Sequence, residues 1–191
     1  MIALITKNLA TTLVLMKNAL RLITICCVMV FAFCATPANA KGSGDKFGDA
    51  QVGLTYGVYK PTNTLGLKRS MFQVMKCQPG MEKWVAASYG FGKKRIDIYQ
   101  NKLDDYCSDA GVSKEVGTTT IKGVLARVFV YCEPWMPKVY AACTARDIAK
   151  FGGYLLFVPS PKLNYKPTMI MVQGVGGITF RQLRTVALSL V

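Results

Sequence analysis

The 191-residue sequence contains no histidine, and its 10 acidic residues are outnumbered by 24 lysines and arginines. Without an imidazole, the chain cannot form a Ser-His-Asp triad or a Cys-His nucleophile pair. It also lacks the most common nitrogen ligand for metal ions. These absences exclude histidine-dependent hydrolases, and we expect no catalytic, metal-binding or cofactor-binding residue.

The first forty residues have the three parts of a secretory signal peptide. Lys17 and Arg21 supply positive charge, residues 22–35 form an apolar run, and Ala38-Asn39-Ala40 is a small-residue cleavage site. Met16 begins a complete signal of ordinary length, so translation could start there. We predict cleavage after this site and a location that is secreted or in the extracytoplasmic cell envelope.

A retained membrane anchor is the main alternative. A spanning helix needs about 20 apolar residues, whereas this run is shorter and is followed by Pro37. A lipoprotein needs a small residue before the lipidated cysteine, and Cys34 follows Phe33. Cleavage is therefore preferred, with residues 41–50 as a flexible Gly- and charge-rich linker and 51–191 as a single domain.

Cleavage removes three of the seven cysteines and leaves Cys77, Cys107, Cys132 and Cys143. An even number in an exported domain favours disulfides, because oxidising compartments let them form and persist. The smallest spacing among the four is eleven positions, wider than the close C-x2-C pairs of structural zinc sites. Two disulfides are expected, and four cysteines allow three pairings.

The expected strands decide among these pairings. Three strands between residues 71 and 100, joined by turns rich in glycine and proline, form an antiparallel meander. The end of the third strand then lies near the end of the first, so Cys107 can reach Cys77, while Cys132 and Cys143 close a short local loop. We predict the disulfides Cys77–Cys107 and Cys132–Cys143.

Further strands are expected downstream. Between residues 121 and 132, apolar and β-branched side chains alternate on both faces, which predicts a partly buried strand. Two apolar runs on either side of the loop 159–167 predict a hairpin. The expected strands are 71–77, 84–89, 95–100, 121–132, 154–158 and 168–172, with a short extended piece at 54–59.

Helices are expected at residues 137–150 and at the C-terminus. Thr179 and Gln182 form the pattern of a capping box, and Ile178 can pack on Leu183 as a hydrophobic staple. One face of the C-terminal helix is apolar and consists of Phe180, Leu183, Val186, Ala187 and Leu190. These elements predict an α+β fold in which an amphipathic helix packs on one face of an antiparallel sheet.

Three short patterns, in order along the chain, resemble a known module. They are Thr120-Ile121-Lys122-Gly123-Val124-Leu125-Ala126, Gly152-Gly153-Tyr154-Leu155-Leu156-Phe157, and Gly177-Ile178-Thr179 before a helix ending Val186-Ala187-Leu188-Ser189-Leu190. Their order resembles the DUF4367-type domain of cell-envelope proteins, itself similar to the periplasmic sigma-regulator sensor and lipoprotein-carrier families. The resemblance covers residues 54–191 and implies a curved sheet with a packed helix, but no particular activity. The four cysteines depart from the pattern.

Two features of the sequence are candidates for catalysis. The only acidic cluster is Asp104, Asp105, Asp109 and Glu115. A glycosidase needs two carboxylates about 5–10 Å apart in a cleft, and a solvated turn near Cys107 is the preferred interpretation. The segment Gly174-Val175-Gly176-Gly177 lacks the lysine of a phosphate-binding P-loop, so it predicts a flexible turn into the helix.

Charge is the remaining functional clue. Removing the three basic residues of the leader from 24 leaves 21 against 10 acidic residues, a formal charge of +11. A charge of this size favours polyanions or anionic surfaces, through attraction that weakens with salt. The candidate anion-binding residues are Lys68, Arg69, Lys93, Lys94 and Arg95, with Lys122, Arg127, Arg181 and Arg184 elsewhere, and Tyr89, Phe91 and Tyr99 as rings that could stack beside the cations.

Three classes of function follow. The first is a non-enzymatic secreted or envelope binding domain with an apolar or anionic-ligand groove. The second is a secreted factor or inhibitor that docks by charge on an acidic partner or on an anionic surface such as lipid head groups or wall polymers. The third, a carboxylate-based hydrolase, is the least favoured. No specific nucleic-acid motif is present, and we do not expect the cleaved protein to span a membrane.

Overall fold

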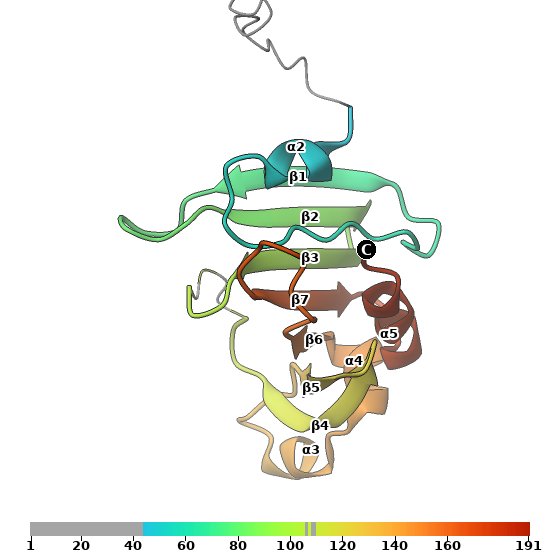
Figure 1. The fold of residues 1–191 in the computed structure, drawn as a ribbon. Helices are drawn as coiled ribbons and strands as arrows, with labels where there is room; N and C mark the ends of the chain where they lie inside the picture. Colours follow the sequence, from blue (N-terminus) through green and yellow to red (C-terminus); the bar gives the residue numbers. More distant parts are fainter. Residues whose placement is uncertain (1–43, 106, 108–109) are drawn as a thin grey trace, which may run out of the picture. The chain divides into compact units, whose positions relative to one another are not determined.

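A computed structural model describes residues 44–105, 107 and 110–191, which belong to one compact unit (Figure 1). The predicted leader, its cleavage site at Ala38 and Ala40, and the alternative start Met16 lie outside the described residues. The strands are β1 (Arg69–Met75), β2 (Trp84–Phe91), β3 (Lys94–Lys102), β4 (Lys114–Ile121), β5 (Val124–Val130), β6 (Gly153–Phe157) and β7 (Thr168–Val175). The helices are α2 (Lys46–Gln51), α3 (Pro137–Ala142), the 3₁₀ turn η1 (Ala145–Asp147), α4 (Ile148–Phe151) and α5 (Phe180–Leu188).

The strands of the described residues form one seven-stranded sheet in the order β1-β2-β3-β7-β6-β5-β4, and every neighbouring pair is antiparallel. The meander β1-β2-β3 therefore joins the second half of the sheet where β3 pairs with β7. This confirms the predicted α+β class, with an antiparallel sheet and a C-terminal helix. The predicted hairpin is also present, as β6 paired with β7.

The main hydrophobic core lies on one face of the sheet. The buried residues of α2, α4 and α5 all belong to it, together with alternate residues of the strands. Gly174 in β7 lets α5 approach closely, because an added Cβ would lie 2.7 Å from Ile178 and 2.8 Å from Leu183. The capping box of Thr179 and Gln182 is confirmed in both directions. The helix thus covers this face as predicted.

The segment between α2 and β1 crosses the same face and is fixed to the sheet by Gln100. This side chain is fully buried in β3. Its amide oxygen accepts a hydrogen bond from the Tyr59 N–H at 2.7 Å, and its amide nitrogen donates to the Tyr59 carbonyl at 2.8 Å. The hydroxyl of the buried Tyr56 donates to the backbone carbonyls of Lys83 and Gln100. The two hydrogen bonds with the Gln100 side chain thus satisfy the backbone N–H and carbonyl of Tyr59.

Two expectations about helices need correction. Part of the predicted flexible linker, residues 41–50, is helix α2, because Asp45 caps its first turn and the buried Phe47 packs edge-on against Phe72 at 4.9 Å. The helix expected at 137–150 is instead broken near Cys143. Asp147 accepts hydrogen bonds from both the N–H and the hydroxyl of Thr144 and so starts a new turn there.

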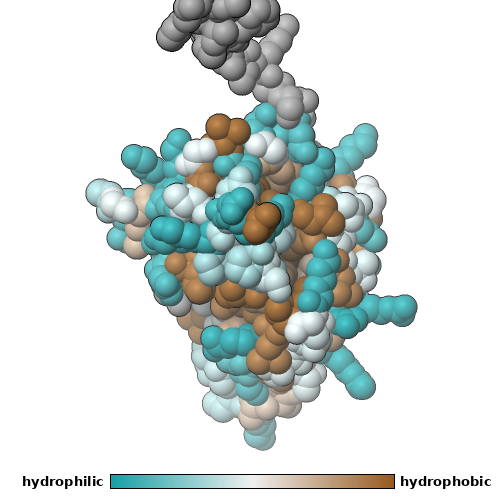
Figure 2. All heavy atoms as spheres, viewed as in Figure 1, coloured by the Kyte–Doolittle hydropathy of each residue, from teal (hydrophilic) through white to brown (hydrophobic). Residues whose placement is uncertain are grey.

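The opposite face of the sheet carries a smaller aromatic cluster. Phe129 and Tyr154 stack with ring centroids 4.6 Å apart and bury Met171 beside them. Trp84 and Tyr99 lie 5.5 Å apart on the same face. In the space-filling view of the molecule, hydrophobic residues show between hydrophilic ones that project around them (Figure 2).

Candidate functional site

The five predicted anion-binding residues come together at one corner of the sheet. Arg69 pairs with Tyr89, and the N–H of Gly90 donates to the carbonyl of Lys68 at 2.9 Å. Across β2, Gly90 pairs with Arg95 and Phe91 pairs with Lys94, so Lys93 lies in the turn between β2 and β3. Since neighbouring strands are about 4.8 Å apart, these five residues lie within a few strand spacings of one another. We call Lys68, Arg69, Lys93, Lys94 and Arg95 the basic corner.

Four of these five cations are open to solvent. Lys68, Arg69, Lys93 and Lys94 are exposed, and none of them forms an ion pair with any residue that the structure describes. Arg69 instead lies 5.7 Å from the Phe72 ring. The four positive charges are therefore available for an external anion.

Arg95 has a different role from the one predicted. Its Nε donates to Asp97 at 2.8 Å, and this carboxylate is almost fully buried. The hydrogen bond and charge of Asp97 raise the pKa of Arg95 above its ordinary value. Because the guanidinium compensates a buried carboxylate, Arg95 contributes less charge to the surface than the other four.

Of the three aromatic residues expected beside these cations, only Phe91 is exposed there, with 73% of its surface accessible. Tyr89 is buried in the main core, and Tyr99 packs against Trp84 on the opposite face. The predicted combination of several stacking rings with cations is therefore not assembled. Instead, a single exposed Phe91 lies among the lysines.

The glycine-rich segment before α5 supports the basic corner. Gly176 and Gly177 have positive φ values of 67° and 85°, which favour glycine. A Cβ added to Gly176 would overlap the carbonyl of Lys93, only 1.6 Å away. The turn between β7 and α5 therefore packs against the β2–β3 turn, and its glycines serve close packing.

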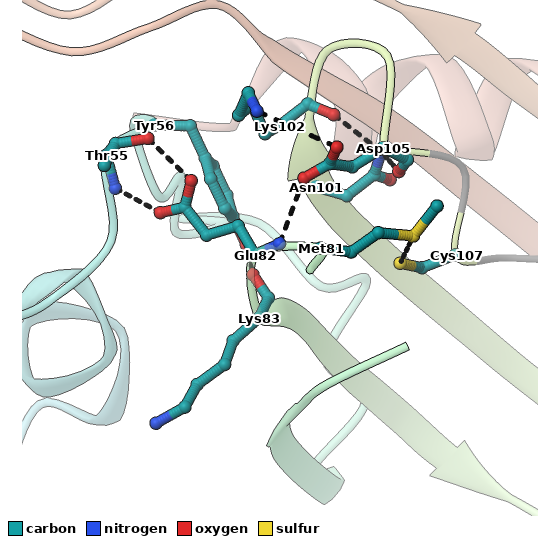
Figure 3. A network of polar contacts seen from close by, with 9 residues as sticks. All are labelled: Thr55, Tyr56, Met81, Glu82, Lys83, Asn101, Lys102, Asp105 and Cys107. Atoms are coloured by element: carbon teal, nitrogen blue, oxygen red, sulfur yellow. Dashed lines mark hydrogen bonds and ion pairs between the residues drawn. The ribbon is translucent and has the colours of Figure 1, made fainter. Parts of the chain in front are cut away.

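The acidic cluster is not assembled into a pair of facing carboxylates among the described residues. Asp105 accepts from the N–H of Glu82 at 3.2 Å and lies 3.8 Å from the Lys102 ammonium (Figure 3). Glu115 is four strand positions away, on the edge strand β4, where Arg127 at 2.5 Å lowers its pKa. Strands β3 and β4 are four strand spacings apart, about 19 Å, and each of the two carboxylates has a cationic partner of its own, so they are not arranged as the facing pair of a glycosidase.

The remaining acidic residues of that cluster add nothing to a site. Asp104 is exposed and has a positive φ of 78° in the turn after β3, a conformation that aspartate tolerates in turns. Asp109 lies outside the described residues. Glu82, which the sequence did not single out, binds the N–H and hydroxyl of Thr55 (Figure 3). The acidic side chains shown there fasten loops together.

The structure forms one of the two predicted disulfides. Cys132 and Cys143 are bonded, with their Cα atoms 6.4 Å apart. Cys77 and Cys107 are thiols, so a bond between them stays a prediction. The two side chains interact nonetheless: burial raises the pKa of Cys107 to about 12, and a hydrogen bond with Cys77 contributes to this rise. The Cys107 sulfur also lies 3.9 Å from that of Met81 (Figure 3).

An apolar pocket of about 170 Å³ lies where α5 meets the sheet. Ile121, Phe157, Ile170 and Leu190 form its buried part. At its rim, the Lys122 ammonium donates to the carbonyl of Leu190. Beside α5, the core face thus leaves room only for a small apolar group.

A further exposed feature was not recognised from the sequence. Trp135 and Met136 have 72% and 47% of their surfaces accessible, and they lie inside the loop that the Cys132–Cys143 bond closes. Both are flanked by prolines, Pro134 and Pro137. A tryptophan between prolines within a disulfide-closed loop is the signal that could have identified it, because such a ring has little space to fold back into a core.

No family model matches the chain, and no curated protein or solved structure matches it significantly. The resemblance to DUF4367-type domains therefore stays a prediction. Within residues 44–191, as far as they are described, no helix is both long and apolar enough to cross a membrane.

Proposed function

We propose that this protein is a non-enzymatic, extracytoplasmic binding domain that docks on an anionic surface through its basic corner. The observation that carries the proposal is the presence of four exposed cations at the ends of adjacent strands, without ion-pair partners among the described residues. The formal charge of +11 that remains after the expected cleavage attracts polyanions from a distance. The exposed Phe91, which pairs with Lys94, adds an apolar contact beside these cations.

A binding role agrees with the chemistry of the rest of the molecule. The chain has no histidine for acid-base catalysis. The described carboxylates of the acidic cluster are separated, and Asp105 and Glu115 pair with Lys102 and Arg127. The Cys132–Cys143 disulfide, together with the exported location expected from the sequence, suits a stable domain at a cell surface.

Vesicle binding tests this function. The protein should co-sediment with vesicles of phosphatidylglycerol and phosphatidylcholine at low salt, and much less at 0.5 M salt, because exposed charges are then screened. Replacing Lys68, Lys93 and Lys94 by glutamine should weaken binding at least tenfold. The matched control changes three other exposed lysines, Lys46, Lys83 and Lys166, to glutamine. Docking through the basic corner would be refuted if both variants lost the same amount of vesicle binding. It would also be refuted if the protein bound neither anionic vesicles nor soluble polyphosphate.

The apolar pocket supports a second candidate, the binding of a small apolar ligand. A cavity of about 150 Å³ can hold a benzene molecule, and this pocket has about 170 Å³. Hexanoate, followed by NMR, should then bind with little salt dependence. Val124→Phe, at the half-buried rim, should block it. Unchanged spectra on addition of hexanoate would exclude this candidate.

A further inference from the structure

The Cys132–Cys143 bond closes a loop that projects from the core. Its two ends are fixed, since Cys132 is 1% and Cys143 is 7% exposed. None of the six residues of α3 within the loop is buried. We call residues 132–143 the disulfide loop. It is a braced element whose outer residues pack little against the rest of the described chain.

The outer part of the disulfide loop is apolar. Trp135 and Met136 are largely exposed, between the exposed prolines Pro134 and Pro137. Single exposed apolar residues are normal on protein surfaces, but here a large ring and a thioether are adjacent in a loop whose motion is restricted by a disulfide and two prolines. Because such a loop loses little conformational entropy on docking, more of the free energy of its apolar contacts contributes to binding.

Basic side chains occur in the disulfide loop and in the segment that follows it. Lys138 is exposed within the loop, and Arg146 and Lys150 are exposed just after it. The Lys114 ammonium donates to the carbonyls of Tyr140 at 2.6 Å and Ala141 at 2.9 Å, which braces α3 and adds a further positive charge. The local charge complements an anionic partner.

The two acidic residues of the region offset this charge only in part. Glu133 is half-buried beside Cys132. The Asp147 carboxylate is engaged by the N–H and hydroxyl of Thr144 at 2.8 and 3.0 Å. The exposed cations of the loop and of the segment after it therefore outnumber the acidic groups that could neutralise them.

We propose that the disulfide loop inserts Trp135 and Met136 into the interface of an anionic lipid bilayer, with Lys138, Arg146 and Lys150 against the head groups. This rests on the proposed docking at an anionic surface and names that surface as a membrane. Tryptophan prefers the boundary between head groups and acyl chains, because its ring is apolar and its N–H is polar. Juxtaposed lysines and arginines are attracted by anionic lipids. A wall polymer offers the charge but no apolar layer for the two side chains.

A single-tryptophan variant gives a direct readout. The chain has two tryptophans, so Trp84→Phe leaves Trp135 as the only one. Its emission should shift to shorter wavelength on anionic vesicles and be quenched by brominated lipids. Neutral phosphatidylcholine vesicles should produce little change. Unshifted and unquenched emission while the protein co-sediments with the vesicles would overturn the insertion.

Substitutions in the loop give a second, independent readout. Trp135→Ala with Met136→Ala should weaken partitioning to anionic vesicles about tenfold or more, the factor expected for losing the burial of one large apolar side chain. The control, Val52→Ala with Leu163→Ala, removes two exposed apolar side chains elsewhere and should bind as the parent does. Equal binding of the loop variant and the control would also overturn the proposal.

The outcomes separate this inference from the proposed function. Binding that depends on the basic corner but leaves Trp135 in water supports the proposed function and refutes loop insertion. If the Trp135 emission shifts on binding and this binding does not depend on Lys68, Lys93 and Lys94, loop insertion is supported and docking through the basic corner is refuted. Binding of soluble polyphosphate without vesicle binding also refutes insertion. Capture of a protein partner by the loop, in the absence of any vesicle binding, would assign it to protein recognition instead.

Discussion

At the scale of single residues, buried polar side chains decide how the chain is fastened. Gln100 is fully buried in β3 and pairs with both backbone groups of Tyr59. An apolar residue of the same size would fill the space but leave an N–H and a carbonyl unsatisfied, which costs about 1–3 kcal/mol for each group. The polar residue is therefore the stabilising choice at this core position.

Gln100→Leu should lower the free energy of unfolding by about 2–4 kcal/mol, because Tyr59 loses both hydrogen bonds while staying buried. Urea denaturation at neutral pH measures this loss. Gln73→Leu, an equivalent change at an exposed position of β1, serves as the control and should change stability by less than about 0.5 kcal/mol. Similar stabilities for the two variants would contradict the role of Gln100.

At the scale of elements, the N-terminal end of α5 shows how local sequence and packing together position a helix. The Thr179 hydroxyl accepts from the Gln182 N–H at 3.2 Å, and the side-chain oxygen of Gln182 accepts from the Thr179 N–H at 2.9 Å. These contacts satisfy donors that the first helical turn leaves unpaired. They also fix the point where the chain turns from β7 onto the core face.

Thr179→Ala should destabilise the protein by about 1 kcal/mol, the usual loss for an N-terminal cap. Thermal unfolding and urea denaturation both measure it. Thr185→Ala, within the same helix, is the matched control, since its hydroxyl only bonds back to the Arg181 carbonyl at 3.0 Å and alanine favours helix. If both variants lost the same stability, the cap would have no special importance.

At the scale of the whole molecule, burial keeps several weak acids protonated. Burial raises the pKa of Tyr89 to about 12, although Arg69 opposes the shift, and burial together with Cys77 raises that of Cys107 to about 12. The pKa of Tyr56 is raised even further by burial. In the unfolded chain, tyrosine and cysteine titrate near 10 and 8.5. The two states therefore differ in protonation at alkaline pH.

The free energy of unfolding should be highest near neutral pH and fall between about pH 9 and 12. In that range the unfolded chain releases protons that the folded protein keeps, so each raised pKa removes stability. Tyr89→Phe should regain about 1 kcal/mol at pH 11, relative to the parent at that pH, and change little at pH 7. Urea denaturation at both pH values tests this. If the free energy of unfolding fell by the same amount from pH 7 to pH 11 in the parent and in Tyr89→Phe, the contribution of Tyr89 would be contradicted.

Much of the fold followed from local patterns. Alternation of apolar residues and short apolar runs predicted the strands of the described residues except β4, and the hydrophobic face and capping box predicted α5, because these signals involve residues within a few positions of one another. The same locality explains the confirmed disulfide, whose cysteines are eleven positions apart. Helix α2 was missed because its stability depends on Phe47 packing against Phe72, a contact between distant segments.

The candidate site was predictable only in part. The sequence pointed to five basic residues, and their gathering at one corner follows from the β1–β2–β3 register. It could not show that Asp97 engages Arg95. Nor could it show that Tyr89 enters the core while Phe91 stays exposed. These outcomes depend on which face of the sheet each side chain occupies and what packs there.

The sequence by itself determined the class of fold, the C-terminal helix, the Cys132–Cys143 bond and the excess of positive charge, since composition and short-range patterns carry that information. The tertiary structure alone decided which charges remain free, which carboxylates are separated and that Trp135 projects from the disulfide loop. The physical reason is that availability for binding depends on burial and on contacts between distant segments, which only the assembled sheet and its packed helices establish.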